Sequence, residues 1–147
     1  MMADTDGSVK ISPVRWVAEQ ARLYEESGGT RGTDMRGSPC LLLDYVGRRS
    51  GDWHRTVLIY GHDGDDYLIV ASNGGATDHP LWYKNLLEHP RVRLRVGTRR
   101  FEAEAETLSP EEKRRVWPHL LEIYPPYQDY QDRTDRDIPV VRLRPLT

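Results

Sequence analysis

The chain is poor in cysteine, in long apolar runs and in excess charge of either sign, and each shortage excludes a class of protein. One cysteine, Cys40, cannot form a disulfide framework, so a reducing compartment is expected. No window approaches the ~20 apolar residues of a membrane-spanning helix, and the first eleven residues lack the apolar core of a signal peptide. The 21 basic and 23 acidic residues leave a net charge of −2, which favours neither nucleic acid nor an anionic membrane. We therefore expect a cytoplasmic protein in which any anion site is local.

Common catalytic signatures are also missing. The five histidines show no HExxH spacing and there is no second cysteine, so no metal site is predicted. The sequence has no G-x-S-x-G nucleophile elbow, no Rossmann glycine pattern and no P-loop. Chemistry that needs a metal or a nucleophilic serine is therefore not expected.

The 147 residues suit one domain, with a flexible N-terminus over residues 1–11 and a single folded domain over residues 12–147. Ser12-Pro13 is typical of a helix start, and a first helix is predicted from there to Gly28-Gly29. A short helix is expected from Asp78 or His79 until just before Pro90. Ser109-Pro110-Glu111-Glu112 is a capping box that opens another helix, which Pro118 either kinks or follows with a second one.

About six strands are predicted between these helices, at residues 40–43, 56–60, 67–71, 91–96, 101–106 and 138–143. The segment 62–66 supplies a hairpin turn, whereas residues 124–130 are expected to be irregular. A mainly β fold with flanking helices follows, in the form of an antiparallel barrel.

Strict alternation of apolar and charged residues over 91–96 and 101–106 predicts a half-buried hairpin. A four-residue loop, Gly97 to Arg100, sets the arginines opposite glutamates, so that Arg95 faces Glu102. Because this register gives every arginine of the row an acidic partner, it argues against a nucleic-acid surface.

Three features offer binding chemistry. The first is Gly47-Arg48-Arg49-Ser50-Gly51, whose N–H groups, hydroxyl and guanidinium forks suit phosphate or carboxylate oxygens; the alternative is a turn that merely carries arginines. The second is the strand end Val70 to Ala76, whose small residues let the backbone approach a flat ligand; the alternative is a plain loop. The third is the series Tyr124, Tyr127 and Tyr130, whose phenols could share one face; the alternative is that these aromatic side chains only pack at the surface.

The joint order of these features resembles the deazaflavin-dependent nitroreductase family. The resemblance runs from about Gly28 to Leu143 and rests on several motifs in order: G-S-P at 37–39, L-L-L at 41–43, G-R-R-S-G at 47–51, A-S-N-G-G-A at 71–76, H-P-L-W-Y at 79–83, and Y-P-P-Y-Q-D-Y-Q at 124–131 followed by T-D-R-D-I-P at 134–139.

The resemblance implies a split β-barrel that binds coenzyme F420 and transfers hydride from the reduced deazaflavin to a small-molecule acceptor, such as a quinone, an enone or a nitroaromatic. It implies that the phosphate and tail of F420 are bound by Arg48, Arg49, Ser50 and Gly51, with His54 and Arg55 further along the same edge. It places the ring system against Val57, Leu58, Ile59, Val70, Ala71, Ser72, Asn73, Leu81, Trp82 and Asn85. Ser72, Tyr124, Tyr127 and Tyr130 are implied as the residues that orient or protonate the acceptor.

The chain departs from the family pattern at Asp44-Tyr45, at His54, where arginine is usual, and at Val57, where proline is usual. A histidine is a cation only when it is protonated, so the sequence does not fix how strongly residue 54 binds the tail of F420. An FMN enzyme with the same barrel and a non-catalytic carrier of a deazaflavin or lipophilic ligand remain alternatives. The apolar face of the first helix is expected to cover the pocket, rather than meet a second subunit of a homodimer or touch a membrane surface.

Overall fold

The computed structural model describes residues 9–146. The strands are β1 (Lys10–Ile11), β2 (Asp34–Met35), β3 (Ser38–Val46), β4 (Trp53–Ile59), β5 (Gly61–Asp63), β6 (Asp66–Val70), β7 (Arg91–Val96), β8 (Arg99–Thr107) and β9 (Val140–Pro145). The helices are α2 (Arg15–Glu26), α3 (Leu81–Glu88), α4 (Pro110–Ile123) and α5 (Pro126–Arg133), with a single 3₁₀ turn at η1 (Asn73–Gly75).

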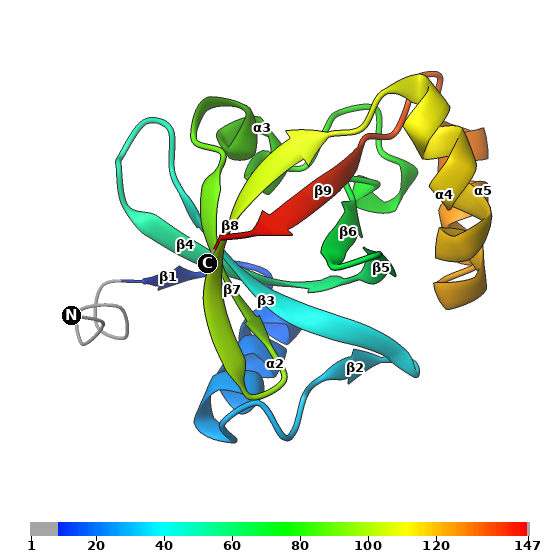
Figure 1. Ribbon diagram of the computed structural model, residues 1–147. Helices are drawn as coiled ribbons and strands as arrows, with labels where there is room; N and C mark the ends of the chain where they lie inside the picture. Colours follow the sequence, from blue (N-terminus) through cyan, green and yellow to red (C-terminus); the bar gives the residue numbers. More distant parts are fainter. Residues whose placement is uncertain (1–8, 147) are drawn as a thin grey trace.

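The strands form one sheet in the order β1-β4-β3-β7-β8-β9-β6-β5, and β2 adds to β3. Neighbours are antiparallel except for β1, which pairs with β4 in parallel. The sheet curls so that β4 also contacts β6, which gives a partly closed barrel (Figure 1). The mainly β, antiparallel prediction is therefore confirmed, and its six strands correspond to the six long ones.

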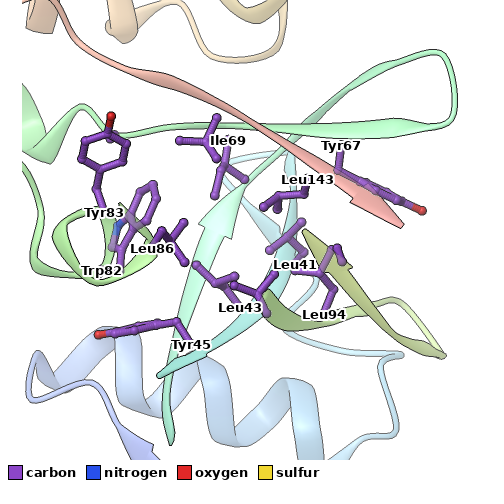
Figure 2. Close-up of a cluster of buried hydrophobic side chains, with 14 residues drawn as sticks. Leu41, Leu43, Tyr45, Tyr67, Ile69, Trp82, Tyr83, Leu86, Leu94 and Leu143 are labelled. Atoms are coloured by element: carbon purple, nitrogen blue, oxygen red, sulfur yellow. The ribbon is translucent and has the colours of Figure 1, made fainter. Parts of the chain in front are cut away.

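The barrel interior holds the largest core cluster. Leu41, Leu43 and Tyr45 project into it from β3 because alternate residues of a strand face the same side. Figure 2 shows Trp82, Tyr83 and Leu86 of α3 side by side at the left of the same cluster. The short helix α3 therefore closes one end of the barrel.

Helix α2 covers the outer face of β3 and β4. Its buried residues are Val17, Ala18, Ala21 and Tyr24, four of the five apolar residues that recur at helical spacing in the sequence. The fifth, Val14, is instead the N-cap residue and is 48% exposed. The hydroxyl of Tyr24 donates to the carbonyl of Cys40 at 3.0 Å and accepts from the N–H of Gly97 at 2.7 Å. These bonds fix the helix to β3 and to the turn between β7 and β8.

Helices α4 and α5 lie together at the other end of the sheet (Figure 1). The capping box is confirmed, because Ser109 and Glu112 bond each other's backbone N–H groups, and Pro118 lies inside one continuous helix. On α4, Arg115 donates to the carboxylate of Asp63 at 2.7 Å, and this hydrogen bond lowers the pKa of Asp63 to about 2. The helix pair is thereby attached to the β5–β6 hairpin.

Three expectations differ from the structure. The irregular segment expected at 124–130 instead enters α5, which has Pro125 as its N-cap and begins at Pro126, a residue type that suits the first helical turn. Three short strands, β1, β2 and β5, were not predicted because two or three residues carry no periodic signal. Of the flexible N-terminus expected at residues 1–11, residues 1–8 lie outside the described part, and Lys10–Ile11 form β1.

The predicted register of the β7–β8 hairpin was also wrong. Val96 pairs with Arg99, so the loop has two residues, and Arg95 lies opposite Arg100 rather than Glu102. Two like charges directly opposite would repel. Glu25 of α2 relieves them, since its carboxylate accepts from Arg95 at 2.7 Å and from Arg100 at 2.8 Å. A partner remote in sequence therefore makes the shorter loop tolerable.

Candidate active site

A cavity of about 590 Å³ lies between the start of α2, the strand β4, the turn after β6 and the first residues of α5. Of the predicted site residues it is lined by His54, Val57, Leu58, Ile59, Val70, Ser72, Asn73, Leu81, Trp82, Tyr124, Tyr127 and Tyr130. This volume is within the ~300–1,000 Å³ of small-molecule sites. Segments from four parts of the chain thus meet at one concave surface.

The turn Ser72–Ala76 lies on one wall of the cavity. Asn73 adopts a φ of +48°, a left-handed conformation that asparagine tolerates better than most residues. Gly75, at φ +80°, packs so closely on α5 that a β-carbon there would lie 2.9 Å from the carbonyl oxygen of Tyr130. The turn and the tyrosine helix are therefore one packed unit.

The three predicted tyrosines come together on the adjacent wall. The hydroxyls of Tyr124 and Tyr130 are 3.2 Å apart, and the ring of Tyr127 lies 4.9 Å from that of Tyr124. The hydrogen bond with Tyr130, together with burial, raises the pKa of Tyr124, and burial raises that of Tyr127. Tyr124 and Tyr127 therefore keep their phenolic protons at neutral pH.

Two of the departures from the family pattern, Tyr45 and His54, are cross-strand partners. Tyr45 pairs with His54, and their rings stack with centroids 5.4 Å apart at the edge of the cavity. Asp44 pairs with Arg55 on the opposite face of the sheet. Replacements at distant points of the sequence thus act together in the structure.

The loop Gly47 to Gly51 adjoins this end of the cavity. A β-carbon at Gly47 would lie 2.8 Å from both the His54 Nε2 atom and the Ser50 hydroxyl, so glycine permits the close approach. The N–H and guanidinium of Arg48 both donate to the side-chain oxygen of Asn85, at 2.9 and 3.0 Å. Arg49 is exposed and has no hydrogen bond or ion pair within residues 9–146. The loop is thus held in place by one arginine and presents the other to solvent.

A family model described as F420H(2)-dependent quinone reductase matches residues 16–145. The chain belongs to this family. Membership confirms the predicted class, an oxidoreductase family that depends on reduced F420.

Individual relatives agree. The F420H(2)-dependent quinone reductase Rv1261c of Mycobacterium tuberculosis is 40% identical over 125 residues, which cover 82% of this chain and 84% of the relative. A second M. tuberculosis protein, the putative F420H(2)-dependent quinone reductase Rv3178, is 36% identical over 73% of this chain and 90% of its own length.

Two solved structures share the fold at 36% identity. One, described as an F420-H2 dependent reductase (FDR-A), has a TM-score of 0.67 and covers 72% of this chain and 94% of its own. The other, described as a domain-swapped dimer, has a TM-score of 0.70 and covers 90% of this chain and all of its own. The split-barrel prediction agrees with these likenesses.

Seven of the residues predicted for the cofactor do not line the cavity of this family member: Arg48, Arg49, Ser50, Gly51, Arg55, Ala71 and Asn85. The first four form the adjoining loop, and Asn85 anchors it. Ala71 is fully buried in the barrel. Arg55 points to the other face of β4, where it donates two hydrogen bonds to Asp44, at 2.8 and 2.9 Å. Alternation along a strand separates it from His54.

The sequence reasoning missed several lining residues: Lys10, Ser12, Pro13, Trp16, Met35, Tyr45, Thr56, Gly74 and Pro80. Four of the nine, Lys10, Ser12, Pro13 and Trp16, belong to the N-terminal segment and the start of α2. Val14 and Val17 line the cavity as well, so the expectation that the first helix covers the pocket is confirmed at its N-terminal end. Trp16, 56% exposed, lies on this rim. The apolar spacing that was predicted gave no sign of Trp16, which lies outside it.

The most important omission is Arg136. Its guanidinium donates to the carbonyls of Ala71 at 3.2 Å, Ser72 at 2.7 Å and Ala76 at 2.9 Å. It also donates to the Nδ1 atom of His79 at 2.9 Å, and burial and the Arg136 cation lower the pKa of His79. One side chain therefore holds both ends of the turn that carries Ser72. No local pattern in the sequence could have revealed this contact, because it spans about sixty residues.

Proposed function

We propose that this chain transfers a hydride from reduced F420 to a quinone that binds in the cavity. The observation that carries the proposal is the meeting of three surfaces: an apolar strand wall, the Ser72 turn and the tyrosine cluster all line one cavity, next to a basic loop. The names of the relatives supply the nature of the donor and acceptor.

The residues present fit F420. Its phosphate requires donors, and the loop offers the unpaired guanidinium of Arg49 together with the N–H groups of Arg49 and Ser50, which have no hydrogen-bond partner within residues 9–146. A flat ring requires an apolar wall, and Val57 to Ile59 provide one beside Ser72 and Asn73. Arg49 would hold the phosphate, and β4 would hold the ring.

When bound, reduced F420 supplies the hydride, and a proton from the protein completes the two-electron reduction of a quinone to its hydroquinone. Charge develops on the quinone oxygen as the hydride arrives, so a nearby O–H group stabilises the transition state. The Ser72 hydroxyl and the paired hydroxyls of Tyr124 and Tyr130 are the donors that line the cavity. We assign them to orienting the quinone and delivering its proton.

The test is anaerobic turnover of reduced F420 with menadione, an enone and a nitroaromatic, followed by the return of oxidised-F420 absorbance. Oxidation by menadione is expected, and Tyr130→Phe is expected to lower kcat more than cofactor affinity. F420 binding without turnover of any acceptor would instead identify a carrier.

Equilibrium titration with F420 and with FMN distinguishes the two cofactors, because a single phosphate could also be held by the loop. Tight FMN binding without F420 binding would contradict the proposal.

We also propose that the protein is cytoplasmic and that it forms a homodimer. No helix of residues 9–146 is long and apolar enough to cross a membrane, and one similar structure is described as a domain-swapped dimer. Light scattering after size exclusion measures the mass directly, and a monomer at micromolar concentration would refute the dimer. Sedimentation with vesicles tests peripheral attachment to a membrane.

A further inference from the structure

A second cavity, of about 340 Å³, shares no lining residue with the cofactor cavity. Its floor is made by β3, β4 and β7, and the end of α2 and the β7–β8 hairpin form its sides. Arg55 lines this cavity, whereas the preceding His54 lines the first one. Both cavities therefore take lining residues from β4, but they have none in common.

The charged groups of this second cavity form one continuous chain. Asp44 accepts from Arg55 at 2.8 Å and lies 4.0 Å from Arg93. Glu25 accepts from Arg95 and Arg100 and lies 3.9 Å from Arg55. Four guanidinium groups thus share two carboxylates. A third acid at the rim, Glu102, does not restore the balance because it pairs with Arg91 outside the cavity, at 3.0 Å.

Most of the excess positive charge is buried. The side chains of Arg55, Arg93 and Arg95 are 7%, 14% and 10% exposed, and those of Asp44 and Glu25 are 9% and 18% exposed. Three buried cations therefore face two buried anions. An uncompensated charge destabilises the protein when it is buried, whereas an exposed one such as Arg100 is screened by water.

Arg93 is the cation whose hydrogen bonding is incomplete. Its Nε and Nη2 atoms are buried and have no hydrogen-bond partner in the described residues. Its guanidinium carbon lies 3.6 Å from the ring centroid of Trp53, a cation–π contact that offsets part of the missing solvation. A planar carboxylate would match the guanidinium fork and supply the missing charge. Leu42, Leu94 and Phe101 also line the cavity and suit an apolar body.

We propose that this cavity is a second ligand site, which binds a small organic anion composed of a carboxylate and an apolar body. The site is independent of F420, since none of the residues that carry the charge lines the cofactor cavity. A ligand bound to Arg93 would shift its guanidinium over the Trp53 ring, so binding should change the fluorescence of Trp53.

The test uses the full chain without F420. Benzoate is titrated by calorimetry and by tryptophan fluorescence, beside inorganic phosphate and the neutral analogue benzamide. We expect saturable benzoate binding in the low-millimolar range or tighter, with a fluorescence change that Trp53→Phe removes. Phosphate is expected to bind more weakly, and benzamide not at all.

Arg93→Met should weaken benzoate binding at least tenfold, whereas Arg144→Met should leave it unchanged, because Arg144 is an exposed arginine paired with Glu104 away from the cavity. If Arg93→Met does not fold, Arg100→Ala serves instead, since that half-exposed arginine also lines the cavity, and a several-fold loss is expected. No saturable binding of benzoate, equal binding of benzamide, or unchanged affinity in the folded arginine variant would each overturn the proposal. Stronger binding of phosphate would overturn the assignment to a carboxylate.

Discussion

Gly75→Ala is the change that tests most directly whether the Ser72 turn and the tyrosine helix act as one unit. Gly75 has a φ of +80°, and an added β-carbon would lie 2.9 Å from the carbonyl oxygen and 3.1 Å from the Cα of Tyr130. The left-handed conformation alone costs an alanine about 1–2 kcal/mol. The backbone contact cannot relax by a rotamer change, so overpacking adds about 1–3 kcal/mol.

Gly74→Ala is the matched control. Gly74 is the neighbouring residue, has a φ of +63° and has nothing within 4 Å of its virtual β-carbon. It therefore carries the same backbone strain without the collision. Urea unfolding should show Gly75→Ala to be less stable than Gly74→Ala by about 1–3 kcal/mol, the overpacking cost alone.

The collision in Gly75→Ala should also displace the Ser72 turn, which lines the active-site cavity. Moving the turn away from Tyr130 separates Ser72 from the tyrosine wall, so kcat with menadione should fall in Gly75→Ala even where the protein is fully folded. Equal stability of the two alanine variants, measured under the same conditions, would refute the close packing on which this reasoning rests.

Four further predictions follow from single residues. Arg136→Lys should speed hydrogen exchange in the 71–76 turn and lower kcat, because lysine cannot make the four contacts of the guanidinium. The control is Arg142→Lys, which weakens an ion-pair cluster remote from the cavity and should lower Tm without changing the hydrogen exchange of the turn or kcat. Arg49→Ala should weaken F420 binding about tenfold at unchanged Tm, and unchanged affinity would remove Arg49 from the phosphate site. The arginine of α4 holds the pKa of Asp63 at about 2, below its unfolded value of about 4. Asp63→Asn should therefore lower the free energy of unfolding by on the order of 1 kcal/mol at pH 7, and by a shrinking amount as the pH falls from 4 to 2. Acid unfolding curves of the two proteins measure this difference. Burial raises the pKa of the Cys40 thiol to about 12, so a disulfide reagent should modify it at the rate of global unfolding, and rapid labelling of the native protein would contradict its burial.

Local patterns accounted for much of the fold. Alternation over 91–96 and 101–106 identified β7 and β8, and helical spacing identified the buried face of α2, because each signal repeats within a few residues. The capping box could also be predicted from the sequence, since both of its partners lie within one turn of helix. The family could be identified because several such motifs occur in a fixed order.

The hairpin register shows where this reasoning stops. Alternation fixes which face each side chain takes, but shifts by two residues preserve the faces, so the loop length stayed undetermined. The decisive partner, Glu25, lies on a helix about seventy residues away.

The sequence by itself determined the types of element, the inward faces and the chemical groups available to the site, because these depend on neighbours along the chain. Only the tertiary structure decided which of those groups share a cavity. It placed the start of α2 over the tyrosines, turned Arg55 away from His54, and set Arg136 behind the Ser72 turn. These contacts depend on how the sheet curls, and no short window of sequence contains that information.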